Sequence, residues 1–210
     1  MFLAIATAHA SQAQIGRQRP TYQAEPGYWV GLSIGYLEGI TTSDEATGAI
    51  WQFGYTSQLR ATLEKTVSPG VTLGVIAGYA TAPLTYQSAQ ISSVCPGSCL
   101  ANADITQYMA FVRGGGRTGT GFRGTYNAEG GVTQFSKFRD RTTHSPLTAG
   151  SGSYDFTFGF GGGFAYGMNR MSELYIEQSY DFVFHKQSSS STNQTVPRLL
   201  TFRGGFRIGF

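Results

Sequence analysis

The stretch Pro197–Phe210, PRLLTFRGGFRIGF, decides the fold. From Leu200 onward, alternate positions are Leu200, Phe202, Gly204, Phe206, Ile208 and Phe210. The positions between them, starting one residue earlier, are Leu199, Thr201, Arg203, Gly205, Arg207 and Gly209. Side chains that alternate in this way lie on opposite faces of a β-strand. A membrane barrel explains both faces, because apolar residues face lipid, polar residues face the lumen, and an aromatic residue ends the strand at the interface.

The same alternation predicts seven further strands. They are expected at residues 28–37, 49–64, 71–82, 105–113, 120–138, 154–167 and 173–184. In the second of them, Trp51 and Phe53 share a parity with Leu59 and are therefore expected on the lipid face. The segments 71–82 and 105–113 are weakly patterned. Each segment has the roughly 9 to 11 residues that a tilted strand needs to cross a bilayer.

The connections between these segments alternate between long and short. Long loops are expected at residues 38–48, 83–104, 139–153 and 185–196, and tight turns at 65–70, 114–119 and 168–172. Outer-membrane barrels have long loops outside and short turns on the periplasmic side. The sequence therefore predicts an all-β fold over residues 28–210, an eight-stranded antiparallel up-and-down transmembrane β-barrel with both termini in the periplasm.

The segment before the first predicted strand has features of export. Residues 1–13 have an apolar stretch and small residues at two cleavage positions, Ala10 and Ala13, so they are interpreted as a signal peptide that is truncated at its start. The alternative is a frayed apolar tail. Residues 14–27 are a polar lead-in. Cys95 and Cys99, in the sequence CPGSC, are expected to form a disulfide, because the Pro-Gly turn brings them together in an oxidising compartment.

Composition excludes several classes of protein. Charged residues make up 13% of the chain and Gly accounts for 29 positions, unlike an ordinary cytosolic enzyme. The net charge of +3, without a Lys/Arg run, argues against a nucleic-acid partner. The sequence contains no apolar run of about 18 residues, so it predicts no transmembrane helix. No cofactor is expected, and two cysteines are too few for a structural zinc site.

Two stretches resemble the small outer-membrane β-barrel superfamily, which includes the OmpA-like transmembrane domain and OmpX-like proteins. They are GFGGGFAYGMNRMSELYIEQSYDF, residues 159–182, and the ending FRGGFRIGF, residues 202–210. The resemblance implies location in the bacterial outer membrane, contact with its lipid and lipopolysaccharide, and a monomer. It also implies that Phe206, Ile208 and Phe210 are the signal read by the barrel-assembly machinery.

The polar parity gathers charged residues that are expected to face the lumen. They are Arg60, Glu64, Arg123, Glu129, Glu177, Asp181, Arg203 and Arg207. Eight strands leave an interior that side chains just fill. Glycines on two strands, including Gly31, Gly35 and Gly161, are expected to make room for the arginines and for Tyr175. We therefore expect a paired charge network that plugs the barrel; the alternative is a narrow path for water or ions.

These features predict a structural or surface-interaction role, with the loop at residues 83–104 as the expected binding surface for an extracellular ligand. A small pore or a carrier of hydrophobic molecules is the alternative. A lipid A-modifying enzyme is more remote. It would use His144 and Ser145, or His185 with Ser188–Ser191, but nothing in the sequence orders these residues into a triad. No enzymatic activity is expected.

Overall fold

The computed structural model describes residues 25–44, 48–87, 95, 97–147, 154–184 and 198–210. The strands are β1 (Tyr28–Leu37), β2 (Thr41–Asp44), β3 (Ala49–Phe53), β4 (Thr56–Ser68), β5 (Val71–Gln87), β6 (Ser98–Gly115), β7 (Gly121–Asp140), β8 (Tyr154–Asn169), β9 (Ser172–Phe184) and β10 (Arg198–Gly209). The signal-peptide prediction at residues 1–13 and the lead-in up to residue 24 lie outside the described residues. Among the described residues, no helix has the length and apolarity needed to cross a membrane.

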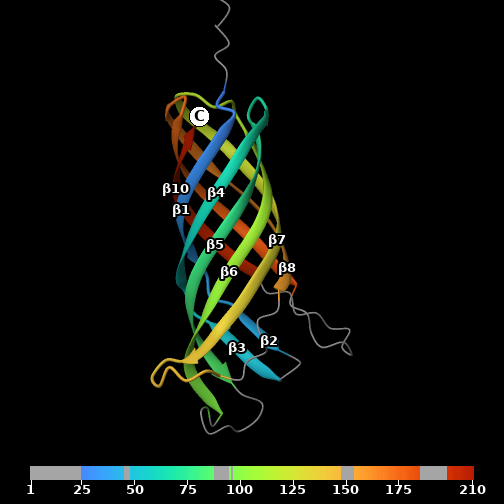
Figure 1. Cartoon of the computed structure of the whole chain (residues 1–210), viewed down its shortest axis with the longest axis vertical. Coiled ribbons are helices and arrows are strands. Elements are labelled where there is room, and N and C mark those ends of the chain that lie inside the picture. The colour runs from blue at the N-terminus through green and yellow to red at the C-terminus, as the bar shows by residue number, and fades with distance from the viewer. Residues whose placement is uncertain (1–24, 45–47, 88–94, 96, 148–153, 185–197) are drawn as a thin grey trace, which may run out of the picture.

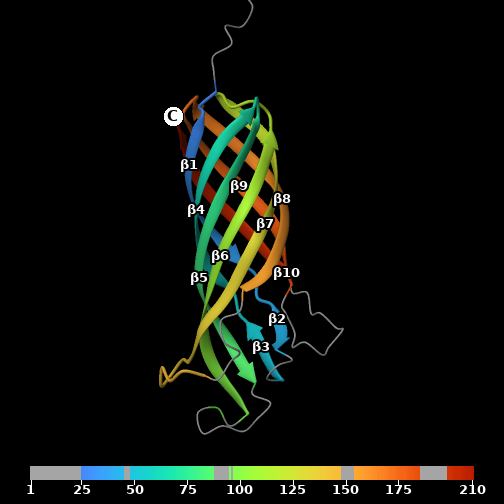
Figure 2. The same ribbon diagram turned by 45° about the vertical axis from the view of Figure 1, so that its right-hand side comes forward.

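Eight of these strands form a closed antiparallel ring. The hydrogen-bonded order is β4, β1, β10, β9, β8, β7, β6 and β5, and β5 also pairs with β4. The terminal strand closes the ring against the first, with registers from Trp29 opposite Gly209 to Leu37 opposite Thr201. Figures 1 and 2 show the tilted strands winding around one axis. The predicted fold class is therefore confirmed.

The two ends of the barrel differ. At one end, here called the turn end, β4 and β5, β6 and β7, and β8 and β9 are joined by short connections. At the other, the loop end, β5, β6 and β7 continue past the rest of the ring and carry the β2–β3 hairpin, which pairs with β5. The asymmetry of connections follows the prediction, but the loop end contains more regular structure than expected.

The prediction of a single strand at residues 49–64 with one lipid-facing side is wrong. The strand is interrupted at Gly54 and Tyr55. Odd-numbered residues face inward before this interruption and even-numbered residues face inward after it. Trp51 and Phe53 are only 2% and 4% exposed and face inward, whereas Leu59 beyond the break faces outward. The backbone N–H of Gly54 donates to the Pro83 carbonyl at 2.7 Å, which supports the change of direction.

The loop expected at residues 83–104 is also shorter than predicted. β5 extends to Gln87 and β6 begins at Ser98, and these extensions pair with each other from Pro83 opposite Asn102 to Gln87 opposite Ser98. The sequence did not predict this part of β5, because it contains Pro83 and the residues after Pro83 show no clear apolar face. Proline is nevertheless tolerated in a strand where its backbone nitrogen needs no ladder hydrogen bond. The disulfide between Cys95 and Cys99 is present, with Cα atoms 5.7 Å apart, and it closes the tip of this extension.

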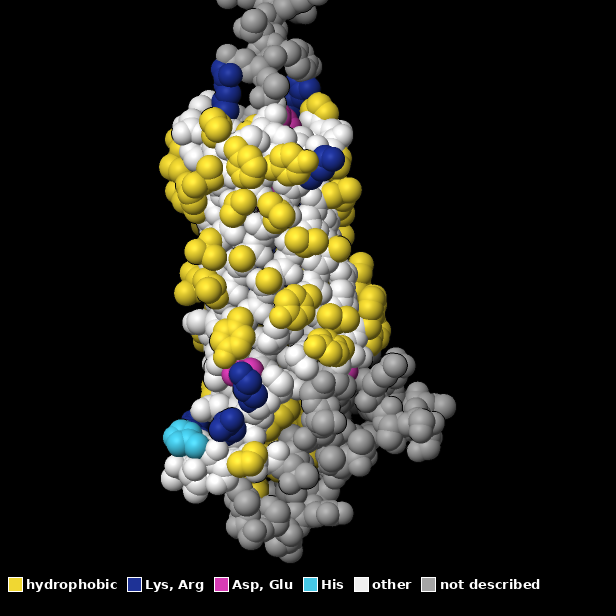
Figure 3. All heavy atoms as spheres, viewed as in Figure 1, with side chains coloured by type: hydrophobic (Ala, Val, Ile, Leu, Met, Phe, Trp, Pro, Cys, Tyr) yellow, Lys and Arg dark blue, Asp and Glu magenta, His cyan; other side chains and the backbone are white. Residues whose placement is uncertain are grey.

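An apolar belt surrounds the ring. Figure 3 shows hydrophobic side chains distributed over the face of the barrel wall in view, and every strand of the ring carries exposed large hydrophobic residues. Aromatic residues mark the margins of the belt. Tyr28 stacks on Phe210 near the turn end, and Tyr36 stacks on Tyr55 toward the loop end, with centroid separations of 6.1 and 5.5 Å. Such a belt with aromatic margins is the exterior of a membrane-spanning barrel.

Candidate functional site in the barrel lumen

The half of the lumen nearest the turn end holds a network of buried ion pairs. Arg60 pairs with Glu129 at 3.1 Å, Arg203 with Glu177 at 3.1 Å, and Arg207 with Glu64 at 2.7 Å and Glu173 at 3.1 Å. Arg123 pairs with Glu173. Arg203 lies 3.9 Å from Glu129, which joins neighbouring pairs. All eight charged residues predicted for the lumen face inward, and seven of them take part in these ion pairs.

Two members of this network were not predicted as site residues. Arg113 of β6 contacts Glu64 and also Glu177 at 3.1 Å, and its guanidinium lies 5.1 Å from the Tyr175 ring centroid. Arg113 was missed because the inward face of β6 is otherwise largely apolar, so its parity was unclear. Glu173 lies two positions before Tyr175, and the period of two could have found it.

The network is balanced in charge. Its buried arginines are Arg60, Arg113, Arg123, Arg203 and Arg207, and its buried carboxylates are Glu64, Glu129, Glu173, Glu177 and Asp181. Five positive charges therefore face five negative charges. Removing charges from water is costly, and pairing with hydrogen bonds is what makes their burial tolerable. Within this network the charges of opposite sign are equal in number, so the network has no excess of either sign with which to attract ions.

A layer of uncharged polar groups follows toward the loop end. Gln58 donates from its amide nitrogen to Gln107 at 2.7 Å, Gln107 donates to Thr133 at 3.3 Å, and the Thr157 hydroxyl donates to Thr133 at 2.7 Å. Asp181, the eighth predicted residue, accepts from Gln107 at 3.5 Å rather than forming a short ion pair. These residues connect β4, β6, β7, β8 and β9 across the lumen.

The loop-end half of the lumen holds a cluster of buried apolar side chains that the sequence pattern did not predict. Trp51 lies 4.7 Å from Phe138 and 6.3 Å from Phe135, centroid to centroid, and Phe53 lies 5.4 Å from Phe135. Leu37, Ile105, Val183 and Leu199 are buried in the same cluster. The expected charge network therefore occupies part of the interior, and this apolar cluster, called the apolar plug below, occupies the part nearest the loop end.

Glycines make room for the large lumen side chains. A Cβ at Gly35 would lie 3.1 Å from the Arg203 Cβ, and one at Gly205 would lie 2.5 Å from the Tyr175 ring. Gly31 lies beside Arg207 and Gly161 beside Asn127. Glycines of the first strand make room for arginines, as the sequence predicted. The glycine that makes room for Tyr175 lies instead on the terminal strand, at Gly205.

Replacing Gly205 by Ala is expected to destabilise the folded barrel by about 1 to 3 kcal/mol, because the added methyl group overpacks the lumen against Tyr175. Urea titration in lipid vesicles would measure the change. The matched control is Gly204→Ala, one residue away on the outer face, where the added Cβ would meet its nearest atom at 3.9 Å. Equal losses for the two variants would contradict the assigned role of Gly205.

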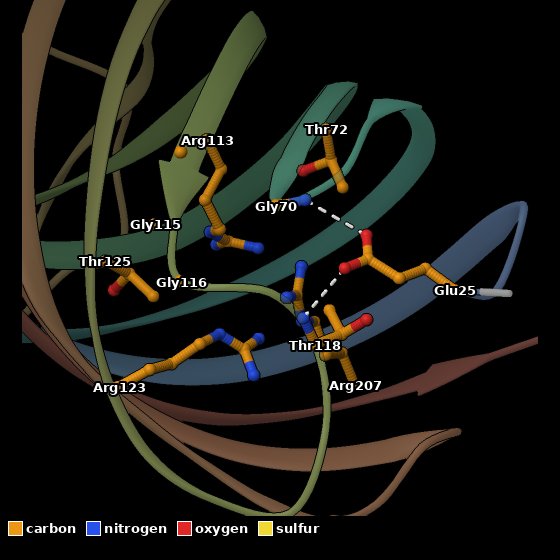
Figure 4. Close-up of a pocket in the computed structure, with 11 residues that line it drawn as sticks. Glu25, Gly70, Thr72, Arg113, Gly115, Gly116, Thr118, Arg123, Thr125 and Arg207 are labelled. Carbon is orange, nitrogen blue, oxygen red and sulfur yellow. Dashed lines mark hydrogen bonds between the residues drawn. The ribbon is translucent and has the colours of Figure 1, made fainter. Parts of the chain in front are cut away.

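The mouth at the turn end is crossed by the chain that precedes β1. The carboxylate of Glu25 accepts from the Gly70 N–H at 3.0 Å and from the Thr118 N–H at 3.1 Å, as the dashed lines in Figure 4 show. The small cavity beneath it has a volume of about 10 Å³ and is lined by Arg113, Arg123 and Arg207, among others. That volume is about enough for one water molecule.

The residues considered for catalysis are not brought together in the described part of the chain. His144 lies on a turn after β7, where its N–H donates to the Asp140 carbonyl at 3.0 Å, and the adjacent Ser145 donates its N–H to the Thr143 hydroxyl at 3.3 Å. The Asp140 carboxylate accepts from the Thr143 N–H and hydroxyl, which holds its pKa below its usual value. His185 and Ser188–Ser191 lie outside the described residues.

A closed ring of eight antiparallel strands, an apolar belt with aromatic margins and a lumen that buries a network of ion pairs together define a transmembrane β-barrel. The solved structures that are similar to it include two small barrels. Neisserial surface protein A has 14% sequence identity and a TM-score of 0.57, and the match covers 90% of this chain and 100% of that one. The outer membrane protein OprG from Pseudomonas aeruginosa has 13% identity and a TM-score of 0.59, covering 89% and 97%.

The chain therefore has the fold of the small outer-membrane β-barrels, the superfamily that its sequence resembles. The expected location in the bacterial outer membrane agrees with that fold. The sequence matches no protein-family model and no curated protein.

Proposed function

We propose that the protein is a non-conducting outer-membrane barrel that stabilises the envelope and presents its loop end to surfaces. The observation that carries the proposal is the filled lumen, in which a neutral ion-pair network and an apolar cluster lie one above the other. An ion would have to displace buried pairs and then cross an apolar layer, and both steps are costly.

The wall of the barrel supports the same proposal over a carrier for hydrophobic molecules. Such a carrier needs an opening in the lumen or between strands. In the described residues the ladders continue around the ring, with β1 paired to β10 from Trp29 to Leu37 and β9 paired to β10 from Ser172 to Phe182. A continuous ladder leaves no lateral exit between these strands.

Recording in planar bilayers tests the non-conducting lumen. The folded wild-type barrel is expected to give no reproducible open steps in symmetric salt at moderate voltages, because neither layer of the lumen offers a continuous water path. A known porin reconstituted in the same way is the positive control. Discrete, reproducible steps from the pure folded protein would contradict the proposal and favour the small-pore alternative.

The loop end is the proposed surface for partners. The extensions of β5, β6 and β7 and the β2–β3 hairpin project past the end of β1 at Leu37, and the disulfide stabilises one tip. A rigid sheet that carries loops is a common way to present a binding surface. Comparing adhesion of cells that carry the intact protein with cells that carry a version lacking residues 88–97 would test this role, and equal adhesion would contradict it.

Deleting Phe210 is expected to lower the fraction of assembled barrel several-fold, because Phe210 is proposed to address the assembly machinery with Phe206 and Ile208. The residue also closes the ring, since its N–H donates to the Tyr28 carbonyl at 2.9 Å and its ring stacks on Tyr28. Heat-modifiable mobility on gels of outer-membrane fractions would measure assembly. Refolding of the deletion variant into pure lipid, without the assembly machinery, measures the effect of ring closure alone. Unimpaired assembly in cells would contradict the proposed signal.

A further inference from the structure

A β-bulge in β7 changes which side chains face outward at the loop end. Along β7, Thr133 and Phe135 face inward, but beyond the bulge the inward residues are Phe138 and Asp140. The pairing with β6 shifts register at this point, between Asn102 and Asp104. Lys137 occupies the bulge with φ of 53°, a left-handed conformation that is uncommon for a residue other than glycine. Bulges at barrel rims often redirect side chains.

The result of this redirection is a row of three outward basic residues. Lys137, Arg139 and Arg141 are exposed on the outer surface, and Phe138 packs inward on Trp51. Without the bulge, the alternation would have placed the three basic residues in the lumen and Phe138 outside. The row is called the basic stripe below. One negative charge offsets it, since Asp104 lies 3.2 Å from the Lys137 ammonium, so its net charge is about +2.

The basic stripe begins where the apolar belt ends. Tyr79, an exposed aromatic of the belt, is hydrogen-bonded through its hydroxyl to Thr81 at 3.1 Å, and Thr81 donates to Asp104 at 3.0 Å. Asp104 in turn pairs with Lys137. Figure 3 shows basic side chains gathered directly beyond the belt on the loop-end side. In a membrane barrel this level corresponds to the headgroups of the lipid leaflet.

A groove continues from the stripe over the outer face of β3, β5 and β6. Its volume is about 450 Å³, and its lining includes Arg141, Leu100, Pro83 and Tyr55. The backbone of Arg141 is held beside Leu100, because the backbone N–H of Arg141 donates to the Leu100 carbonyl at 2.9 Å. The groove thus combines a guanidinium with apolar and aromatic surface, which suits an amphipathic ligand with an anionic group.

We propose that the basic stripe and this groove bind the phosphate groups of lipopolysaccharide in the outer leaflet. Guanidinium groups bind phosphate oxygens in a bidentate manner, and Lys contributes a point charge. The position at headgroup level selects a lipid phosphate rather than a soluble one. The inference rests on the proposed orientation, with the loop end facing outward, and does not depend on whether the lumen conducts.

The test uses the folded full-length barrel in zwitterionic detergent, titrated with lipopolysaccharide and followed by thermophoresis. The triple variant K137Q/R139Q/R141Q is expected to bind about 150-fold more weakly, because each basic group at an anionic surface contributes about 1 kcal/mol and the variant removes three of them. The matched control K65Q/R117Q/R170Q removes three exposed positive charges near the turn end and is expected to keep wild-type affinity. Heat-modifiable mobility verifies that each variant is folded.

Two further ligands distinguish the source of the phosphate. Dephosphorylated lipopolysaccharide is expected to bind the wild type as weakly as the intact lipid binds the triple variant. Inorganic phosphate at the same phosphate concentration is expected not to displace the lipid. Displacement by inorganic phosphate, equal losses in both triple variants, or unchanged binding in K137Q/R139Q/R141Q would each overturn the proposal. If that variant does not fold, the single variants R139Q and R141Q, each expected about fivefold weaker, replace it.

Discussion

Replacing Glu129 by Gln is expected to destabilise the folded barrel by about 3 to 5 kcal/mol, because it leaves Arg60 buried without its ion-pair partner. Arg60 is 2% exposed and donates to both carboxylate oxygens of Glu129, at 3.1 and 3.3 Å. Gln keeps nearly the same volume, so the loss reports the charge and not a cavity. Urea titration in lipid vesicles, followed by tryptophan fluorescence, would measure the free energy of unfolding.

A double-mutant cycle separates the pair from its surroundings. Arg60→Met combined with Glu129→Gln is expected to cost less than the sum of the two single losses, by about 2 kcal/mol, because no unpaired partner remains at that position. Glu38→Gln is the matched control, since Glu38 is exposed at the loop-end side of β1. Additive losses in the cycle, or an equal loss for the control, would show that the pair does not stabilise the barrel.

The part of this network that the sequence predicted came from parity alone. In a barrel wall the side-chain period is two, so a charged residue on a strand with a clear apolar face must face the lumen. That reasoning placed Glu177 and Asp181 on β9 and Arg203 and Arg207 on β10. It identified the face of each residue, but the partners depend on the registers between strands, which the sequence does not specify by itself.

The alternation of side chains did not predict which residues face inward where both faces of a strand are apolar or where the strand is irregular. Arg113 was missed because Met109 and Phe111 precede it on the inward face of β6, opposite the outward Tyr108 and Val112. The break at Gly54 reversed the faces of β3 relative to β4, and the bulge at Lys137 reversed those at the end of β7. Each irregularity depends on tertiary packing, and together they build the apolar plug from residues whose pattern predicted lipid contact.

Replacing Trp51 by Ala is expected to cost about 3 to 5 kcal/mol, because the deletion leaves a cavity at the centre of this plug. Trp51 is 2% exposed and contacts Phe53, Phe135 and Phe138, which come from β3 and β7. The same urea titration measures the loss. Ile50→Ala is the matched control, since Ile50 is the adjacent residue on the outer face and is 40% exposed. Equal losses would place the stabilising contacts outside the lumen.

The Trp51 variant also tests whether the lumen is closed twice. If the apolar plug and the polar network close it independently, Trp51→Ala alone should remain non-conducting, because Arg60, Glu129 and their neighbours still fill the other half. Combining it with Arg60→Ala and Glu129→Ala should also give no open steps, because Arg113 and Arg207 stay paired with Glu64 nearer the turn end; heat-modifiable mobility verifies that the triple variant is folded. Conduction by the single variant would mean that the charged half is permeable, so that the apolar plug alone closes the barrel.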